Sequence, residues 1–305
     1  MNDLLKSALD NAGVNHRSMP ATMRAVKYTA RHRDSLTIHT IIAASPHESG
    51  LFERWEAMQS AWLSDDFRAW KKACASYLLG TENAKTTKGE KLAILTAIMY
   101  LSPDEESGFK LCPKASPECS LLCLKHAGRL RFDTAQCARL CKTWGMIMHT
   151  EFFFRWFEEE LRRVQRMADR LGYRLFVRPN GLSDWPFWRK APGMFADNPD
   201  TQFYDYTKVP ENAEAFLAGK LPKNYHLTFS RSELNEAYCL ELLARGMNVA
   251  VVFANELPKY WRCFPVVNGD ETDARPDDNT GSIGTVIGLK AKGVLKTRDS
   301  EFKVS

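Results

Sequence analysis

The chain has 305 residues, of which 44% are hydrophobic and 26% are charged, and this composition excludes a disordered or fibrous protein. Its 42 Lys and Arg against 37 Asp and Glu give a net charge of +5, which by itself does not predict a nucleic-acid-binding protein. The longest apolar run, Val249 to Ala254, is far shorter than the roughly 20 residues of a transmembrane helix, and the first residues lack the apolar core of a secretory signal. We therefore expect a soluble, cytoplasmic protein with no membrane partner.

The first hundred residues are predicted to be helical. One helix has Leu51, Trp55, Met58 and Trp62 at helical spacing, and three further segments complete this region. These are a helix from Asp65 that ends at Gly80, a polar segment over Thr81–Glu90, and an apolar, buried helix over Leu92–Leu101. The polar segment is the predicted boundary. We expect a helical extension over residues 1–80, an α/β domain over 81–293 and a C-terminal tail over 294–305.

A long helix over His149–Arg170 is predicted to precede a region in which strands alternate with helices. The predicted strands are Arg174–Val177, Gln202–Tyr206, Tyr225–Phe229, Val249–Phe253, Cys263–Val267 and Ile283–Leu289, and the clearest helices between them are Glu211–Ala218 and Ser232–Ala244. This alternation indicates β/α units with right-handed crossovers. The expected fold class is α/β, with N-terminal helices followed by a mostly parallel, partial β/α barrel or sheet.

Polar residues follow several predicted strands, where ligands bind in parallel α/β folds. The candidate ligand-binding residues are Asp184, Lys208, Ser230, Glu233, Asp273 and Arg275. A carboxylate and an arginine in one cleft suit an amino-acid-like or nucleotide-like group. The alternative is that these residues are polar only because they lie in loops.

Five of the eight cysteines fall close together in the sequence, and three of them have the spacing C-x6-C-x3-C as Cys112, Cys119 and Cys123. Ser116-Pro117 predicts the start of a helix that carries both Cys119 and Cys123 on one face. Three convergent thiolates suit an iron–sulfur cluster. A four-thiolate zinc site that also uses Cys137 and Cys141 is a second possibility, and no metal is a third. Cys74, Cys239 and Cys263 are expected to be ordinary buried residues.

Basic residues surround this cysteine segment, and Asp133 is the single acid among them. They are Lys125, His126, Arg129, Arg131, Arg139 and Lys142. Such a cationic shell would lower the pKa of nearby thiols or hold an anion. The alternative is a solvated basic helix face. His126, like Cys137 and Cys141, could also supply a fourth cluster ligand.

Many short segments of the chain resemble one bacteriophage family. They are Lys85–Glu90, Tyr100–Pro103, Ser107-Gly108, Cys112–Ser116, Cys119, Cys123-Leu124, Ala127–Arg129, Ala138-Arg139, Lys142-Thr143, Gly181–Asp184, Phe203–Lys208, Tyr225–Ser230, Ser232-Glu233, Asn235, Gly269-Asp270, Asp273–Arg275 and Gly288–Gly293. The family is typified by a mycobacteriophage protein named gene product eighty-eight, and the resemblance covers roughly Ala84 to Gly293. It implies an iron–sulfur protein made during phage infection, with three recurrent cysteines that match Cys112, Cys119 and Cys123.

Three cysteines before a β/α domain also resemble the radical SAM enzymes, in which three thiolates hold a [4Fe-4S] cluster and leave one iron open to S-adenosylmethionine. The spacing in this chain departs from the C-x3-C-x2-C of that superfamily. The leading hypothesis is therefore a phage-encoded [4Fe-4S] protein in the host cytoplasm that acts on a small molecule, with S-adenosylmethionine as a possible further cofactor.

The alternative function is a basic binding module that redirects a host protein or a nucleic acid, with a structural cluster or zinc site. Residues Lys125 to Lys142 and the run Arg24, Lys27, Arg31, His32 and Arg33 would make that contact. A steep salt dependence of nucleic-acid binding would identify it.

Overall fold

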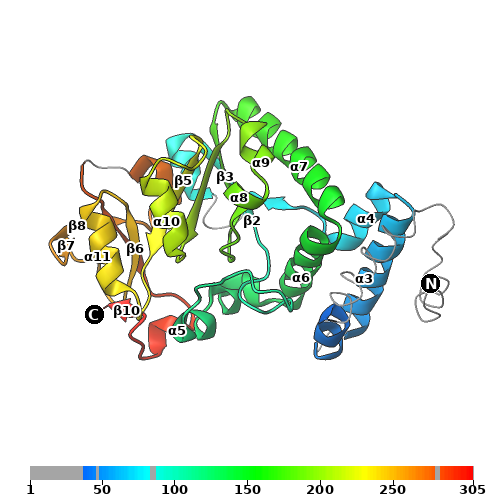
Figure 1. Cartoon of the computed structure of the whole chain (residues 1–305), viewed down its shortest axis with the longest axis horizontal. Coiled ribbons are helices and arrows are strands. Elements are labelled where there is room, and N and C mark those ends of the chain that lie inside the picture. Colours follow the sequence, from blue (N-terminus) through cyan, green and yellow to red (C-terminus); the bar gives the residue numbers. More distant parts are fainter. Residues whose placement is uncertain (1–36, 46–47, 83–86, 279–281, 305) are drawn as a thin grey trace.

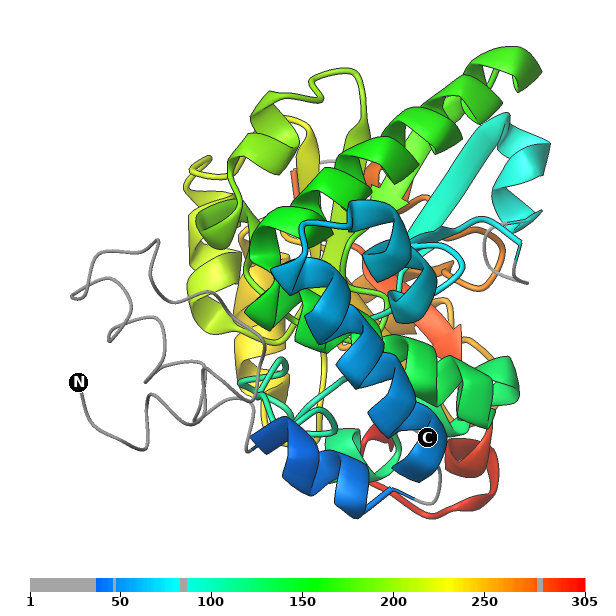
Figure 2. The same ribbon diagram turned by 90° about the vertical axis from the view of Figure 1, so that its right-hand side faces the viewer.

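The computed structural model describes residues 37–45, 48–82, 87–278 and 282–304. It shows an α/β protein, which confirms the expected fold class. Helices α3 (Glu48–Leu63) and α4 (Phe67–Cys74) lie at one end of the molecule and the sheet at the other, with α6 (Asp133–Met148) and α7 (Thr150–Leu171) between them (Figure 1). In the perpendicular view, α3 and α4 stand in front of α7 with the sheet behind (Figure 2). The early basic run from Arg24 to Arg33 lies outside the described residues.

The sheet has ten strands and is mostly parallel. The strands are β1 (Leu79–Gly80), β2 (Ile94–Met99), β3 (Arg174–Arg178), β4 (Gln202–Thr207), β5 (Tyr225–Ser230), β6 (Val249–Phe253), β7 (Tyr260–Trp261), β8 (Phe264–Asn268), β9 (Val286–Lys290) and β10 (Lys303–Val304). Their spatial order is β1-β2-β3-β4-β5-β6-β9-β8-β7, with β10 paired to β6. Only the β1–β2 and β7–β8 pairs of the described strands are antiparallel. No pair among those strands joins β1 to β7, so the sheet has two free edges.

Strand β2 corrects one prediction, because the sequence Leu92–Leu101 was expected to be a helix. All six residues of β2 are buried between β1 and the parallel strand β3. A strand buried on both faces has a continuous apolar sequence, which periodicity cannot distinguish from a buried helix. The branched side chains of Ile94, Thr96 and Ile98 favour the strand.

The two faces of the sheet differ in chemistry. Val177, Phe203 and Leu227 face a large apolar core shared with the helices, whereas Phe176 and Tyr204 face the other way and pack with Ala274. Because successive strand residues point to opposite faces, this alternation follows from the strand sequences. One face of the sheet therefore packs against helices, and the other bears polar and aromatic groups.

The covering helices are α8 (Phe187–Lys190), α9 (Gly193–Ala196), α10 (Pro210–Leu217) and α11 (Glu236–Ala244), together with α7. Two of them, α10 and α11, confirm predicted helices, although α11 begins at Glu236 rather than Ser232, and α8 and α9 were not predicted. Helix α7 ends at Gly172, whose φ of 68° gives the left-handed cap that glycine adopts without strain. Helix α4 corrects a second prediction: it ends at Cys74, and Gly80 lies in β1 rather than at a helix terminus.

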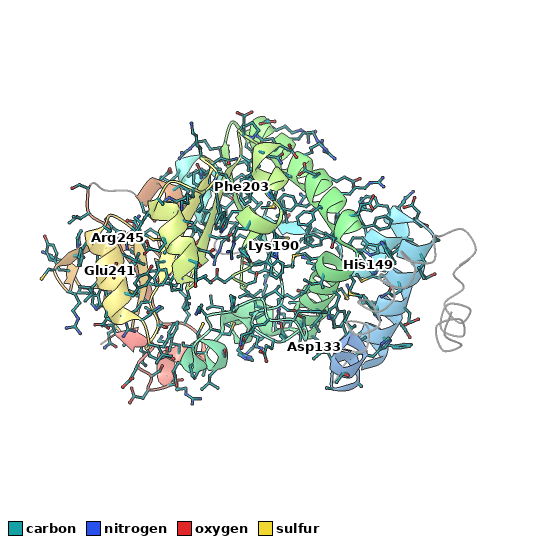
Figure 3. The ribbon with its side chains drawn as sticks, in the orientation of Figure 1. Asp133, His149, Lys190, Phe203, Glu241 and Arg245 are labelled. Atoms are coloured by element: carbon teal, nitrogen blue, oxygen red, sulfur yellow. The ribbon has the colours of Figure 1, made fainter. Side chains whose placement is uncertain are left out.

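The helical end of the molecule is held by aromatic packing around His149, which lies where α6 meets α7 (Figure 3). The Trp70 indole N–H donates to Nδ1 of His149 at 2.9 Å. The His149 ring also stacks on Trp55 and Trp62 at centroid distances of 5.5 and 4.9 Å. Because His149 and Trp70 are both buried, this contact joins α4 to the α6–α7 junction within the core.

Residues 294–304, predicted to be a tail, contain helix α12 (Val294–Thr297) and strand β10, and β10 pairs in parallel with β6. Arg231 donates to the main-chain oxygens of Glu301 and Phe302 at 2.9 and 3.0 Å. The segment is thus bound to the same strand ends that carry the candidate site. Across the described part of the chain, no helix has the length and apolarity to cross a membrane.

Candidate functional site

A cavity of about 250 Å³ opens at the carboxyl ends of the parallel strands. Residues that follow β3, β4, β5 and β8 line it, and so does the cysteine segment. Of the predicted site residues, the cavity brings together Cys112, Cys119, Cys123, Asp184, Lys208, Ser230 and Asp273. These seven residues therefore line one cavity, and their role as a functional site stays a prediction.

The local sequence determines the conformation of the cysteine segment. Ser116 caps helix α5 (Pro117–Leu121), and its hydroxyl accepts from the main-chain N–H of Cys119 at 3.2 Å. The helix ends at Leu121, however, and Cys123 lies in the turn beyond it, which corrects the prediction that one helix carries both cysteines. Cys112 lies in the preceding loop, where its thiol donates to the main-chain oxygen of Leu182 at 3.6 Å.

The three thiols lie near enough to influence one another. Burial, together with smaller contributions from the charges of Asp184, Cys119 and Cys123, raises the pKa of Cys112 to about 12, against a main-chain hydrogen bond from Asp104 that lowers it. Burial, with a contribution from Cys119, also raises the pKa of Cys123. Within the described ranges, no three His, Cys, Asp or Glu residues are close enough together to hold a metal ion. The chemistry of the three thiols suits a soft metal, because thiolates are the ligands that such metals select, but their spacing in this structure does not form a metal site.

The candidates for a fourth ligand lie elsewhere. Cys137 and Cys141 are on α6, where Cys141 is fully buried in the hydrophobic core and Cys137 packs against it. His126 is exposed on the turn that follows Cys123. None of these three residues lines the cavity.

Asp184 and Lys208 adjoin on neighbouring loops after β3 and β4. The Asp184 carboxylate accepts from the main-chain N–H of Lys208 at 2.7 Å and from the Thr207 hydroxyl at 3.2 Å. Burial raises the pKa of Asp184 to about 6, although these hydrogen bonds and the Lys208 charge lower it. The carboxyl therefore fixes the β4 loop and titrates near neutral pH.

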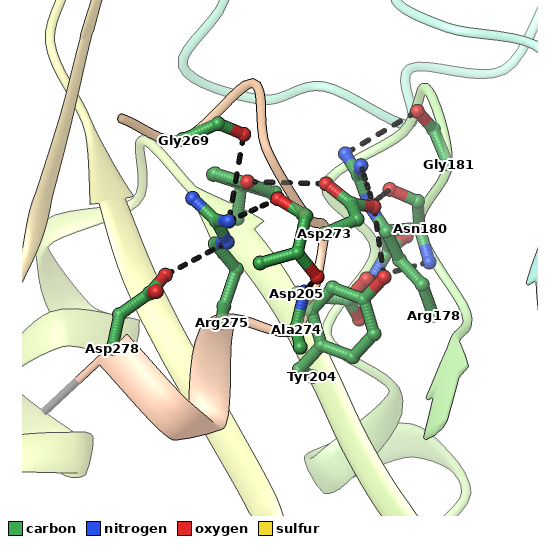
Figure 4. A network of polar contacts seen from close by, with 12 residues as sticks. Arg178, Asn180, Gly181, Tyr204, Asp205, Gly269, Asp273, Ala274, Arg275 and Asp278 are labelled. Atoms are coloured by element: carbon green, nitrogen blue, oxygen red, sulfur yellow. Dashed lines mark hydrogen bonds and ion pairs between the residues drawn. The ribbon is translucent and has the colours of Figure 1, made fainter. Parts of the chain in front are cut away.

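Asp273 is the centre of a buried polar network beside the cavity (Figure 4). It accepts from the Tyr204 hydroxyl at 2.8 Å and forms an ion pair with Arg178 at 3.4 Å. Arg178 also donates to the main-chain oxygens of Asn180 and Gly181, and its guanidinium lies 4.5 Å from the centre of the Tyr206 ring. A side chain at Gly181 would collide with Met99 and Tyr100, so only glycine fits this close approach.

Sequence reasoning missed Arg178 and Asp205, which lie within strands rather than after them. Asp205 is fully buried in β4 and accepts from the main-chain and side-chain N–H groups of Asn180 at 2.8 and 2.9 Å and from the Tyr225 hydroxyl at 2.9 Å. Burial raises the pKa of Asp205 to about 7. A charged residue inside an otherwise buried strand was the available signal, because such groups are found where a partner exists.

Two predicted site residues do not line the cavity. The Glu233 carboxylate accepts from the Ser116 hydroxyl at 2.8 Å and from the main-chain N–H of Glu118 at 3.1 Å, so it holds the start of α5. Arg275 is fully buried, forms an ion pair with Asp278 at 3.0 Å, and donates to the main-chain oxygens of Gly269 and Thr272 (Figure 4). Both residues support the loops that surround the cavity.

The basic residues near the cysteines are largely used within the fold. Arg139 is buried and forms an ion pair with Glu106 at 3.1 Å, and Lys125 lies 3.9 Å from the same carboxylate. Burial lowers the pKa of Lys142 to about 8, and its ammonium lies 5.1 Å from the centre of the Tyr77 ring. Arg129 and Arg131 are exposed. The six residues therefore do not form one continuous basic face.

The fold and site define an α/β protein with a cysteine-lined cavity at the carboxyl ends of its parallel strands. A model of the bacteriophage gene product 88 family matches residues 77–304, and the chain belongs to this family. The match extends beyond the range expected from the sequence, to include β1 and β10. It gives no support to the expected iron–sulfur cluster or to the likeness to radical SAM enzymes. Neither the curated proteins nor the solved structures compared with the chain gave a match.

Proposed function

We propose that Cys112, Cys119 and Cys123 hold a [4Fe-4S] cluster, and that the cavity binds a small molecule beside it in the infected host cell. The observation that carries this proposal is that all three cysteines line one cavity together with Asp184, Lys208, Ser230 and Asp273. Thiolates are the ligands that iron–sulfur clusters select. The cluster would supply either electrons or an iron with an open coordination position.

The residues of the chain would position the thiols from both sides. Ser116 and Glu233 fix the start of α5 and hence Cys119, and the loop that follows β3 contacts Cys112 through Leu182. The Leu111 main-chain oxygen accepts from the N–H of Asp184 at 3.0 Å, which joins the cysteine loop to the β3 loop. The site thus depends on a few hydrogen bonds between segments that are distant in the sequence.

A structural zinc site is less well supported than a cluster. Zinc in structural sites has four protein ligands in tetrahedral arrangement. The cavity offers three cysteines, and Cys137 and Cys141 lie outside it. Three thiolates leave a cluster with one iron for another ligand, which agrees with a site that also binds a small molecule.

Anaerobic purification followed by metal and sulfide analysis tests this proposal. We expect about four iron and about four acid-labile sulfide per chain, with the brown colour of such clusters. Stoichiometric zinc without sulfide, after expression with iron available, would overturn the cluster.

S-adenosylmethionine is the specific ligand that we propose for the open iron. Electron paramagnetic resonance of the reduced cluster should change when it is added, and Ser230→Ala or Asp184→Asn, which alter the cavity wall, should weaken that change while iron is retained. Glu211→Gln is the matched control, since Glu211 is exposed and lies outside the cavity. An unchanged spectrum would exclude this ligand and leave the cluster proposal to the metal analysis.

A further inference from the structure

We infer that the cavity binds a small amphipathic anion whose carboxylate or phosphate contacts the ammonium of Lys208 and whose apolar part lies against β6, β9 and the C-terminal segment. This inference rests on the part of the proposed function that makes the cavity a ligand site. It requires neither the cluster nor S-adenosylmethionine, and the anion is an alternative occupant of the same cavity.

Lys208 differs from the other cations of the cavity. Its main-chain N–H is bonded to Asp184, whereas its ammonium lies 5.6 Å from the centre of the Phe302 ring. In the parts of the chain that the structure describes, this ammonium forms no direct salt bridge, although its charge lowers the pKa of the nearby Asp184 carboxyl. The charge is half-buried at the cavity wall, where an unpaired cation is costly and an anionic ligand would relieve the cost.

The remaining cations of the wall have protein partners. Arg178 is paired with Asp273 at 3.4 Å, Arg231 with Glu236 at 2.9 Å, Lys290 with Glu256 at 2.9 Å and Lys292 with Asp270, and Lys88 donates to the main-chain oxygen of Asp270. The wall holds six Lys and Arg against three Asp. The excess of positive charge favours an anion, and Lys208 is the group free to contact it directly.

Part of the cavity wall is apolar. It consists of Ala250 and Val252 of β6, Leu289 of β9, and Leu295 and Phe302 of the C-terminal segment. A ligand that fills the cavity therefore buries an apolar portion while its charged end reaches Lys208. The volume of about 250 Å³ lies just below the usual range for ligand pockets, which limits the ligand to a small molecule.

An ammonium binds either a carboxylate or a phosphate, since it acts as a compact point charge with three donors. The competing explanation for Lys208 is that it offsets the negative charge of thiolates or of a cluster. The two explanations predict different losses when the charge of Lys208 is removed. If Lys208 binds the ligand, the affinity for the anion falls; if it offsets the charge of a cluster, iron is lost.

Isothermal titration calorimetry of the full chain at neutral pH and low salt tests the inference, with benzoate and phenyl phosphate as probes and benzyl alcohol as the neutral analogue. We expect one of the two anions to bind and the alcohol to bind more weakly. Lys208→Met should weaken the anion about tenfold or more, the loss of one charge-assisted hydrogen bond, and Lys208→Arg should retain it. Lys223→Met, which removes an exposed charge outside the cavity, is the matched control.

The preferred probe distinguishes a carboxylate ligand from a phosphate ligand. The inference is overturned if Lys208→Met binds the anion as tightly as the unaltered protein does, or if the alcohol binds as tightly as the anion. It is also overturned if Lys208→Met loses iron while its anion affinity is unchanged. Iron and sulfide are measured on the same samples. If the protein contains no sulfide but binds the anion through Lys208, the cluster proposal is wrong and this inference stands. If the cluster is normal but Lys208→Met does not change the anion affinity, this inference is wrong and the cluster proposal stands.

Discussion

Two groups of cysteines occupy different surroundings in this protein. Cys74, Cys141 and Cys239 are fully buried among hydrophobic side chains, whereas Cys112, Cys119 and Cys123 line a cavity with charged residues. Cys263 was expected to be buried as well, but it is exposed. Cys141 is near the second group in sequence and belongs to the first in space. Proximity to the strand ends, rather than proximity in sequence, separates cysteines that pack from cysteines that can bind a ligand.

The largest expected effect is on iron content, and it tests the difference between the two groups of cysteines. Cys112→Ala, Cys119→Ala or Cys123→Ala should each remove essentially all iron and sulfide, because a cluster bound by three thiolates loses one of its few attachments. Cys74→Ala and Cys239→Ala should retain full iron, measured per folded chain. Equal iron loss in both groups would show that the distinction between them is wrong.

Substitutions in the helical end of the molecule should change the free energy of unfolding but not the iron content. Trp70→Ala removes a buried indole that contacts His149, Phe152 and Trp156, and it should lower the free energy of unfolding by about 3–5 kcal/mol. Denaturant unfolding measures the loss. Phe52→Ala, on the half-exposed face of α3, should change little. If the folded Trp70 variant lost iron in proportion to stability, the two regions would not be separable.

Asp205 should make stability depend on pH. Its pKa is raised by burial from 3.8 to about 7, so the folded state favours the protonated carboxyl. The free energy of unfolding should therefore fall as pH rises from about 4 to about 7, by at most about 4 kcal/mol. Asp205→Asn should flatten this slope, whatever its effect on the absolute value. A slope that is unchanged in the variant would assign the pH dependence to other groups.

The smallest effect concerns the cap of the cysteine helix. Ser116→Ala removes an acceptor for the Cys119 N–H and a donor to Glu233, and it should cost about 1 kcal/mol. Release of iron to a chelator should accelerate about fivefold, the equivalent of that energy. Ser282→Ala, in an exposed bend, serves as the control. An unaltered release rate would mean that the cap does not act on Cys119.

The sequence predicted the parallel strands because each has a short apolar run with polar residues after it. Strand β6 agrees with its predicted bounds, Val249–Phe253. β2 was not predictable in this way, since burial on both faces removes the alternation that identifies a strand. The predicted domain limits and metal ligands stay predictions.

The candidate site was predictable where side chains follow strands and not where they depend on pairing across the sheet. Asp184, Lys208 and Asp273 were found from their positions, and all three line the cavity. Glu233 follows a strand as well, yet it caps a helix more than a hundred residues away in sequence. Which of two such roles a carboxylate takes depends on tertiary contacts that no local pattern contains.

The C-terminal segment places a constraint on biosynthesis. Leu295 and Phe302 form part of the wall that faces Cys112 and Cys123, and β10 reaches the sheet only by pairing with β6. A ribosome that adds ~5–20 residues per second needs roughly 10 to 40 s to pass from the last of the three cysteines to this segment. During that interval the C-terminal part of the cavity wall is absent. The three thiols of the nascent chain are then accessible to oxidants and to any proteins that deliver iron and sulfide.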